Sequence, residues 1–72
     1  MEPTIVRFSL ETEYIELAKL LKATDLCSSG GVAKISISEG WVKVDGVVEL
    51  RKGRKIRRGQ KVELEGIVVE VD

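Results

Sequence analysis

Apolar residues alternate with polar ones near the start of the chain and then take up a helical spacing. Within residues 3–10, Val6 and Phe8 fall on one side of an extended chain and Arg7 on the other, a period that predicts a short, half-buried strand. Over residues 12–21 the apolar positions recur every three or four residues, with acids early and lysines late, as the helix dipole prefers. We therefore predict a first helix with Thr12 as its N-cap and its end within 24–27.

The segment 32–39 fits two patterns. Ala33, Ile35 and Ile37 alternate as in a strand, whereas Ala33 and Ile37 also lie one helical turn apart. Serines and glycines precede the segment and Gly40 follows it, and these are typical helix boundaries. The spacing slightly favours a strand and the boundaries favour a helix, so the residues alone leave both open.

The second half of the chain consists of short alternating runs typical of strands. Residues 41–44 and 47–50 flank an Asp-Gly dipeptide at 45–46, which tolerates the positive φ angles of a type I′ hairpin turn. Residues 61–65 and 67–71 read as further strand, with a glycine between them that permits a turn or a bulge. We therefore predict a hairpin followed by more sheet.

Length and composition limit the kinds of protein that this chain can be. Its 72 residues suffice for one modest core, so we expect residues 1–72 to form a single domain. One cysteine allows no internal disulfide, and the absence of histidine removes the usual zinc sites, which favours a reducing compartment. The chain has neither a basic-then-apolar leader nor an uncharged apolar run that could cross a bilayer, so we expect a soluble cytoplasmic protein.

Positive charge is concentrated in one segment. The 12 basic and 12 acidic residues cancel, yet seven basic residues and no acidic one lie between Arg51 and Lys61. Clustered guanidinium and ammonium groups release counterions from phosphates, and arginine can also hold a phosphate with two donors or stack on a base. The alternative is a solvated loop on a neutral protein. Seven bases without one acid is an unfavourable arrangement if solubility is the only purpose, so we favour nucleic-acid binding.

The sequence lacks the groups that catalysis requires. No acid–base pair, activated nucleophile or metal cluster is evident, and the glutamates fit the polar faces of strands and of the first helix. Cys27 is interpreted as a small buried hydrophobe, because no histidine can serve as its base. We expect a non-enzymatic protein that needs no cofactor.

Several short motifs follow one another in a fixed order. They are Ser29-Gly30-Gly31, Ala33-Lys34, Gly40, Val42-x-Val44-Asp45-Gly46, Arg51, Arg54-Lys55, Gly59 and Val62. In this order they resemble the S-four-like RNA-binding domain, also called the alpha-L motif, and within it the small stand-alone bacterial members. Asp45 and Gln60 depart from the family's usual asparagine and aspartate.

The resemblance has implications for both fold and function. It implies an α+β fold in which two N-terminal helices pack on a small, mainly antiparallel sheet, with a core motif over about 12–66, and it implies a helix at about 30–39. The implied activity is binding of structured RNA, ribosomal or transfer RNA, across the second helix and the loops beside the hairpin. A link to the ribosome or its assembly follows from the same resemblance.

Basic side chains supply most of the predicted RNA contacts. A serine at the start of the second helix and a tryptophan at the start of the hairpin complete them. Without the resemblance, Ser29 is better explained as a helix cap, and packing is the better explanation for both Trp41 and Tyr14 of the first helix. The predicted contacts are Ser29, Lys34, Trp41, Lys43, Arg51, Lys52, Arg54, Lys55, Arg57, Arg58 and Lys61.

A second hypothesis uses the same charges differently. A protein-interaction module could dock an acidic partner on the basic segment and add another sheet at an edge strand formed by residues 68–71. The alternating glutamates at that end of the sheet argue mildly against pairing of two copies, so we expect a monomer.

Overall fold

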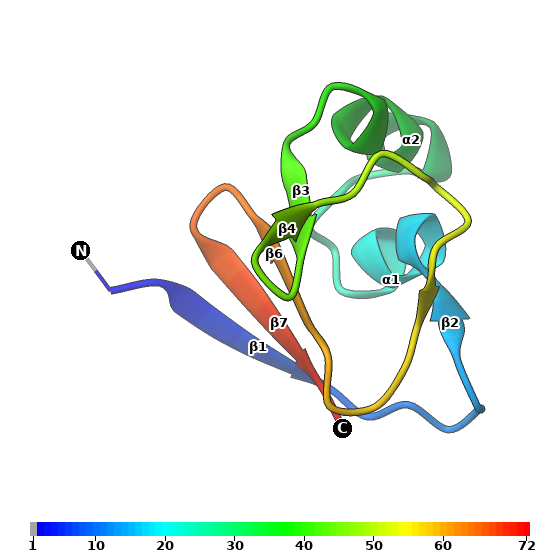
Figure 1. Cartoon of the computed structure of the whole chain (residues 1–72), viewed down its shortest axis with the longest axis vertical. Coiled ribbons are helices and arrows are strands. Elements are labelled where there is room, and N and C mark those ends of the chain that lie inside the picture. The colour runs from blue at the N-terminus through cyan, green and yellow to red at the C-terminus, as the bar shows by residue number, and fades with distance from the viewer. Residues whose placement is uncertain (1) are drawn as a thin grey trace.

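The architecture combines one larger sheet, two helices and a small strand pair (Figure 1). The structure, a computed structural model, describes residues 2–72. In chain order the elements are β1 (Thr4–Phe8), β2 (Ile15–Glu16), α1 (Leu17–Ala23), α2 (Gly30–Ser38), β3 (Val42–Val44), β4 (Val47–Val48), β5 (Lys55–Ile56), β6 (Lys61–Leu64) and β7 (Ile67–Val71).

The larger sheet has five strands in the order β1-β7-β6-β3-β4 within the described chain. Strand β1 runs parallel to β7, while the β7–β6, β6–β3 and β3–β4 pairs are antiparallel. The mainly antiparallel α+β prediction is therefore confirmed, but the helices are not N-terminal: β1 precedes them. The apolar side of β1 packs on the core through Val6 and Phe8, and its backbone pairs with the otherwise open side of β7.

The position of β7 contradicts one part of the protein-interaction hypothesis. That hypothesis needs residues 68–71 to form an edge strand, whereas β7 has β1 on one side and β6 on the other. Its main-chain donors and acceptors already face two neighbours, so no partner strand can be added there. The edges of this sheet are β1 and β4.

The first helix begins four residues later than predicted, with its N-cap at Glu16 instead of Thr12. Ile15 and Glu16 are extended and pair with β5, and Glu16 takes the N-cap position without a side-chain cap bond. The Thr12 hydroxyl instead donates to the carbonyl of Tyr14 over 2.8 Å, so Thr12 is not the N-cap and Tyr14 is not on the helix. The prediction failed because Ile15 pairs with Ile56 of β5, a distant partner that local spacing cannot reveal. The predicted end is confirmed, with Thr24 as the C-cap.

The second helix resolves the ambiguity at 32–39 in favour of the family resemblance. Ala33, Ser36 and Ile37 are buried, whereas Ile35, which a strand would bury together with Ala33 and Ile37, is 61% exposed. The Ser29 side chain accepts a hydrogen bond from the Val32 amide over 3.2 Å, so its role as a helix cap is confirmed.

The hairpin turn forms as predicted. Asp45 and Gly46 have φ angles of 51° and 83°, which a type I′ turn requires at both central positions, and Val44 pairs with Val47. The Asp45 carboxylate accepts hydrogen bonds from the Lys61 amide at 2.9 Å and from Gln60 Nε2 at 3.1 Å. The two departures from the family pattern, Asp45 and Gln60, thus bond to each other.

The core lies between the sheet and the helices, which cover the same face of it (Figure 1). Alternate residues of β3, β6 and β7 point into it, and α1 contributes four buried apolar side chains from its seven residues. Cys27 is buried, as predicted. The largest fully buried side chains of the core are Leu17, Leu20, Leu21, Ile37, Ile56, Val42, Val62 and Val69.

Candidate nucleic-acid interface

The predicted basic segment, residues 51–61 and hereafter the basic loop, runs from the hairpin past both helices to β5 and β6 (Figure 1). Main-chain hydrogen bonds fasten it to the start of α1. The amides of Leu17 and Ala18 donate to the carbonyls of Arg54 and Lys52 over 2.9 and 3.1 Å. These amides are among the helix donors that have no partner within the helix, so the loop completes the beginning of α1.

A buried acid at the start of this loop was missed by the sequence analysis. Glu49 is 8% exposed, and its Oε1 lies 2.7 Å from Arg54 Nη1 and 3.1 Å from Arg51 Nη2. Its Oε2 accepts from Arg51 Nε at 3.1 Å and from the amides of Leu50 and Arg51 at 3.0 and 3.1 Å. Two of the predicted RNA-contacting arginines are therefore held by one carboxylate.

These donors change the acidity of Glu49. The hydrogen bonds from Arg51 and then from Arg54 lower the pKa of the Glu49 carboxyl to about 2, against a smaller opposing effect of burial. The signal for this residue was present in the sequence. The Asp-Gly turn fixes the hairpin register, and the Glu49 amide bonds to the carbonyl of Val42, so Glu49 lies on the side of the hairpin that carries buried valines.

The remaining basic side chains of the loop also differ in their partners. Arg57 Nη1 lies 3.3 Å from Glu13 Oε1, Arg58 donates to the Leu10 carbonyl, and Lys61 Nζ lies 3.9 Å from Glu70 Oε2. Lys52 and Lys55 have no acidic partner among residues 2–72. Fewer of the loop's basic side chains are therefore unpaired than its sequence suggests.

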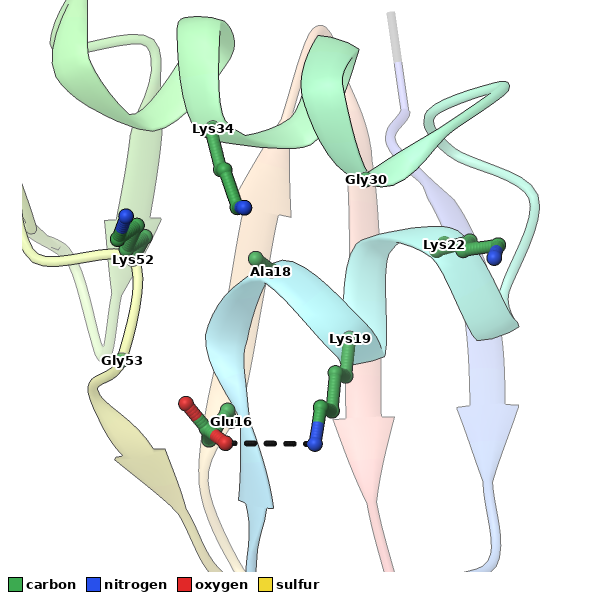
Figure 2. A pocket seen from close by; sticks show the side chains of 8 residues that line it. All are labelled: Glu16, Ala18, Lys19, Lys22, Gly30, Lys34, Lys52 and Gly53. Atoms are coloured by element: carbon green, nitrogen blue, oxygen red, sulfur yellow. Dashed lines mark ion pairs between the residues drawn. The ribbon is translucent and has the colours of Figure 1, made fainter.

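Lysines from three segments border one hollow in the surface, hereafter the lysine hollow (Figure 2). Lys34 extends from α2 toward Ala18 of α1, and Lys52 borders the hollow from the basic loop. Lys19 lies 3.4 Å from Glu16, the hollow's one acid. The volume is about 420 Å³, and the lining residues are Glu16, Ala18, Lys19, Lys22, Gly30, Lys34, Lys52 and Gly53.

The lysine hollow contains predicted and unpredicted residues. Lys34 and Lys52 were predicted contacts, and the structure brings them to the same site. Lys19 and Lys22 were missed because their late position in α1 was explained by the helix dipole alone. A second hollow lies beside it and shares Gly53, so the two form one continuous surface. The second is lined by Arg51, Gly53, Arg54 and Lys55.

The aromatic residues lie outside the lysine hollow. Trp41 is 59% exposed, and Lys43 is exposed on the face of the sheet opposite to Val42 and Val44, so neither lines this hollow. Tyr14 contacts the basic loop instead. Its ring centroid lies 4.8 Å from Lys55 Nζ and 5.7 Å from Arg57 Cζ, within reach of a cation–π interaction.

Within residues 2–72 no group of three or more Cys, Asp or Glu side chains could hold a metal ion. The helices of the described chain are too short and too polar to span a membrane.

The fold and the site define an S4 domain, and the chain belongs to this family, whose pattern matches residues 8–72. The predicted resemblance is therefore confirmed. Among particular relatives, YbcJ of Escherichia coli K12 is 52% identical over 58 residues, which cover 81% of this chain and 83% of YbcJ. "Probable ribosome maturation protein RlbA" of Bacillus subtilis is 45% identical over 58 residues, covering 81% and 82% of the two chains.

A solved structure supports the same assignment. The solution structure of E. coli YbcJ, described as an alpha-L motif involved in RNA binding, matches with a TM-score of 0.71 at 49% identity. The match covers 92% of this chain and 85% of that one. The chain is therefore similar to its relatives over most of their length.

Proposed function

We propose that this protein binds structured RNA, ribosomal or transfer RNA, without catalysing a reaction on it. The observation that carries the proposal is that Lys19, Lys22, Lys34 and Lys52 all line one hollow, which shares Gly53 with the hollow lined by Arg51 and Arg54. Four ammonium groups against one paired carboxylate make this surface a site for phosphates. The RNA-binding motif of YbcJ and the ribosome-maturation name of RlbA support the same function.

The predicted contacts take different parts in this proposal. Lys34 and Lys52 bind phosphate in the lysine hollow, while Arg51, Arg54 and Lys55 bind it along the adjoining hollow. The amides at the start of α2 favour an anion near Lys34 even with the Ser29 oxygen occupied as a cap. The other predicted side chains extend the contact at its margins: Trp41, Lys43, Arg57, Arg58 and Lys61.

The partner and the setting follow from the same surface. Phosphate contacts carry no sequence information, so the protein recognises RNA shape rather than a base code. We propose a monomer of the bacterial cytoplasm that acts on the ribosome or during its assembly.

The decisive test compares a substitution of one lysine of the hollow with a substitution of a basic residue elsewhere on the surface. Fluorescence anisotropy would measure binding of an RNA hairpin and of a DNA duplex of equal length over a salt series. For Lys52→Gln we expect a salt slope shallower by about one counterion and a weaker affinity for the hairpin at every salt concentration. Arg7→Gln removes the same charge from β1, where Arg7 lies 3.7 Å from Glu70 and outside both hollows, so it should leave the slope unchanged.

The opposite results would refute the proposal. If the wild-type protein preferred the DNA duplex, or if Arg7→Gln weakened binding as much as Lys52→Gln, the lysine hollow would not be an RNA site.

The alternative hypothesis is that the protein binds an acidic protein partner. Because β7 is not an edge strand, this hypothesis now rests on the basic loop alone. Pull-downs from lysate with and without nuclease separate the two hypotheses. We expect the captured set to disappear when RNA is digested, whereas a set that survives unchanged would favour the protein partner.

A further inference from the structure

The Glu49 carboxylate accepts more hydrogen bonds than any other acidic side chain in the described chain, and all of its donors lie within residues 50–54. Its two oxygens accept five hydrogen bonds, two from loop amides and three from Arg51 and Arg54 side chains. A carboxylate offers about four lone-pair directions. Its accepting capacity is therefore filled, and none remains for a ligand.

The two arginines are held in different ways. Arg51 approaches with Nε on one oxygen and Nη2 on the other, which is the two-pronged geometry that fixes the plane of a guanidinium. Arg54 uses one nitrogen, Nη1, and its side chain is 34% exposed. The Arg51 side chain is 73% exposed despite its two bonds, so most of this guanidinium faces solvent.

The free edge of Arg51 has a fixed direction. A guanidinium carries five N–H donors in one plane, and the pairing with Glu49 uses those on Nε and one on Nη2. The donors on Nη1 and the second on Nη2 point away from Glu49. Arg51 also lines the hollow shared with Gly53, Arg54 and Lys55, so these donors border the surface that continues into the lysine hollow.

From this geometry we infer that Glu49 is a positioning residue for RNA binding. It does not touch the RNA. It holds Arg51, and through the amides of Leu50 and Arg51 the start of the basic loop, so that the outward edge of the Arg51 guanidinium is set in place for a phosphate before RNA arrives. This role rests on the proposed function and assigns Arg51 a specific part in it.

The inference makes a prediction opposite to that of simple electrostatics. Replacing Glu49 by glutamine removes a negative charge beside the basic loop, which by charge alone strengthens binding of a polyanion. A glutamine at the same place puts an NH₂ group against the donors of Arg51 or Arg54, so the pairing breaks on one side. Ordering a released arginine then weakens binding by about threefold to tenfold.

The experiment measures the affinity of a fluorescein-labelled RNA hairpin for four variants and the wild type. Glu49→Gln removes the pairing and one charge, and Glu11→Gln removes one charge from an exposed side chain without an ion pair in residues 2–72. Arg51→Gln and the double variant Glu49→Gln/Arg51→Gln complete a double-mutant cycle. The NMR signal of Arg51 Nε–H reports the pairing directly, and circular dichroism verifies folding.

The expected pattern is specific to positioning. Glu49→Gln should bind the hairpin about threefold to tenfold more weakly and Glu11→Gln no more weakly than wild type. Most of the loss should disappear when Arg51 is already glutamine. The Arg51 Nε–H signal should be sharp in the wild type and lost in Glu49→Gln. If Glu49→Gln fails to fold, Glu49→Asp, which keeps the charge and withdraws the carboxylate by one methylene, should show the same weakening.

Two results would overturn the inference. If the folded Glu49→Gln variant bound the hairpin as tightly as Glu11→Gln, the charge and not the position would matter, and RNA binding itself would stand. If the wild-type protein bound no hairpin, the proposed function would fail and this role with it.

Discussion

At the scale of single residues, the most informative side chain is an acid within a basic segment. Glu49 turns Arg51 and Arg54 from free charges into parts of a fixed arrangement. Asp45 has a comparable role at the other end of the loop, where hydrogen bonds from the Lys61 amide and then from Gln60 lower the pKa of its carboxyl. Both ends of the basic loop are thus held by carboxylates of the hairpin.

The Glu49 carboxylate should make folding stability depend on pH. Its pKa is lowered in the folded protein from 4.5 to about 2, so its contribution is complete above the unfolded value and is lost as pH falls from 4.5 toward 2. Because Arg51 and Arg54 lose their charged acceptor at a nearly buried position, we expect Glu49→Gln to lower the free energy of unfolding at neutral pH by about 1 to 2 kcal/mol.

Urea unfolding of the wild type and Glu49→Gln at several pH values between neutral and 2 checks this. The difference between the two proteins should narrow as the solution becomes acidic. A difference that stayed constant over that range would contradict the assigned ionisation of Glu49.

At the scale of elements, alternation predicted β1, the hairpin and the strands after it, because each apolar face packs on one core. Local spacing failed at two places. The start of α1 is set by the pairing of Ile15 with Ile56 and by carbonyls of the basic loop, both distant in sequence. The second helix was predicted only through family resemblance, since its β-branched residues alternate like those of a strand.

The cap of α2 gives a prediction at this scale. Replacing Ser29 by alanine leaves the Val32 amide without its side-chain acceptor, so the free energy of unfolding should fall by about 1 kcal/mol. Ser28→Ala is a matched control, because this neighbouring exposed serine forms no side-chain hydrogen bond within residues 2–72. Equal losses in the two variants, measured by urea unfolding, would argue against the cap.

At the scale of the whole molecule, a chain of zero net charge presents an uneven surface. The lysine hollow joins α1, α2 and the basic loop, and its members lie at 19, 22, 34 and 52 in the sequence. Sequence reasoning could find Lys34 and Lys52 through motif and charge run, but not Lys19 and Lys22, because only the packing of α1 against α2 brings them together. Burial of Glu49 escaped prediction for a related reason: the register of the hairpin had to be followed past the turn.

The measurement that tests the central claim most directly is an NMR titration of the ¹⁵N-labelled protein with an RNA hairpin. The account predicts that the largest amide shifts occur around the lysine hollow and the adjoining loop, at Gly30, Lys34, Lys52 and Gly53, while the outer face of β1 at Ile5 and Arg7 stays unchanged. Shifts confined to β1, or none at saturating RNA, would contradict it.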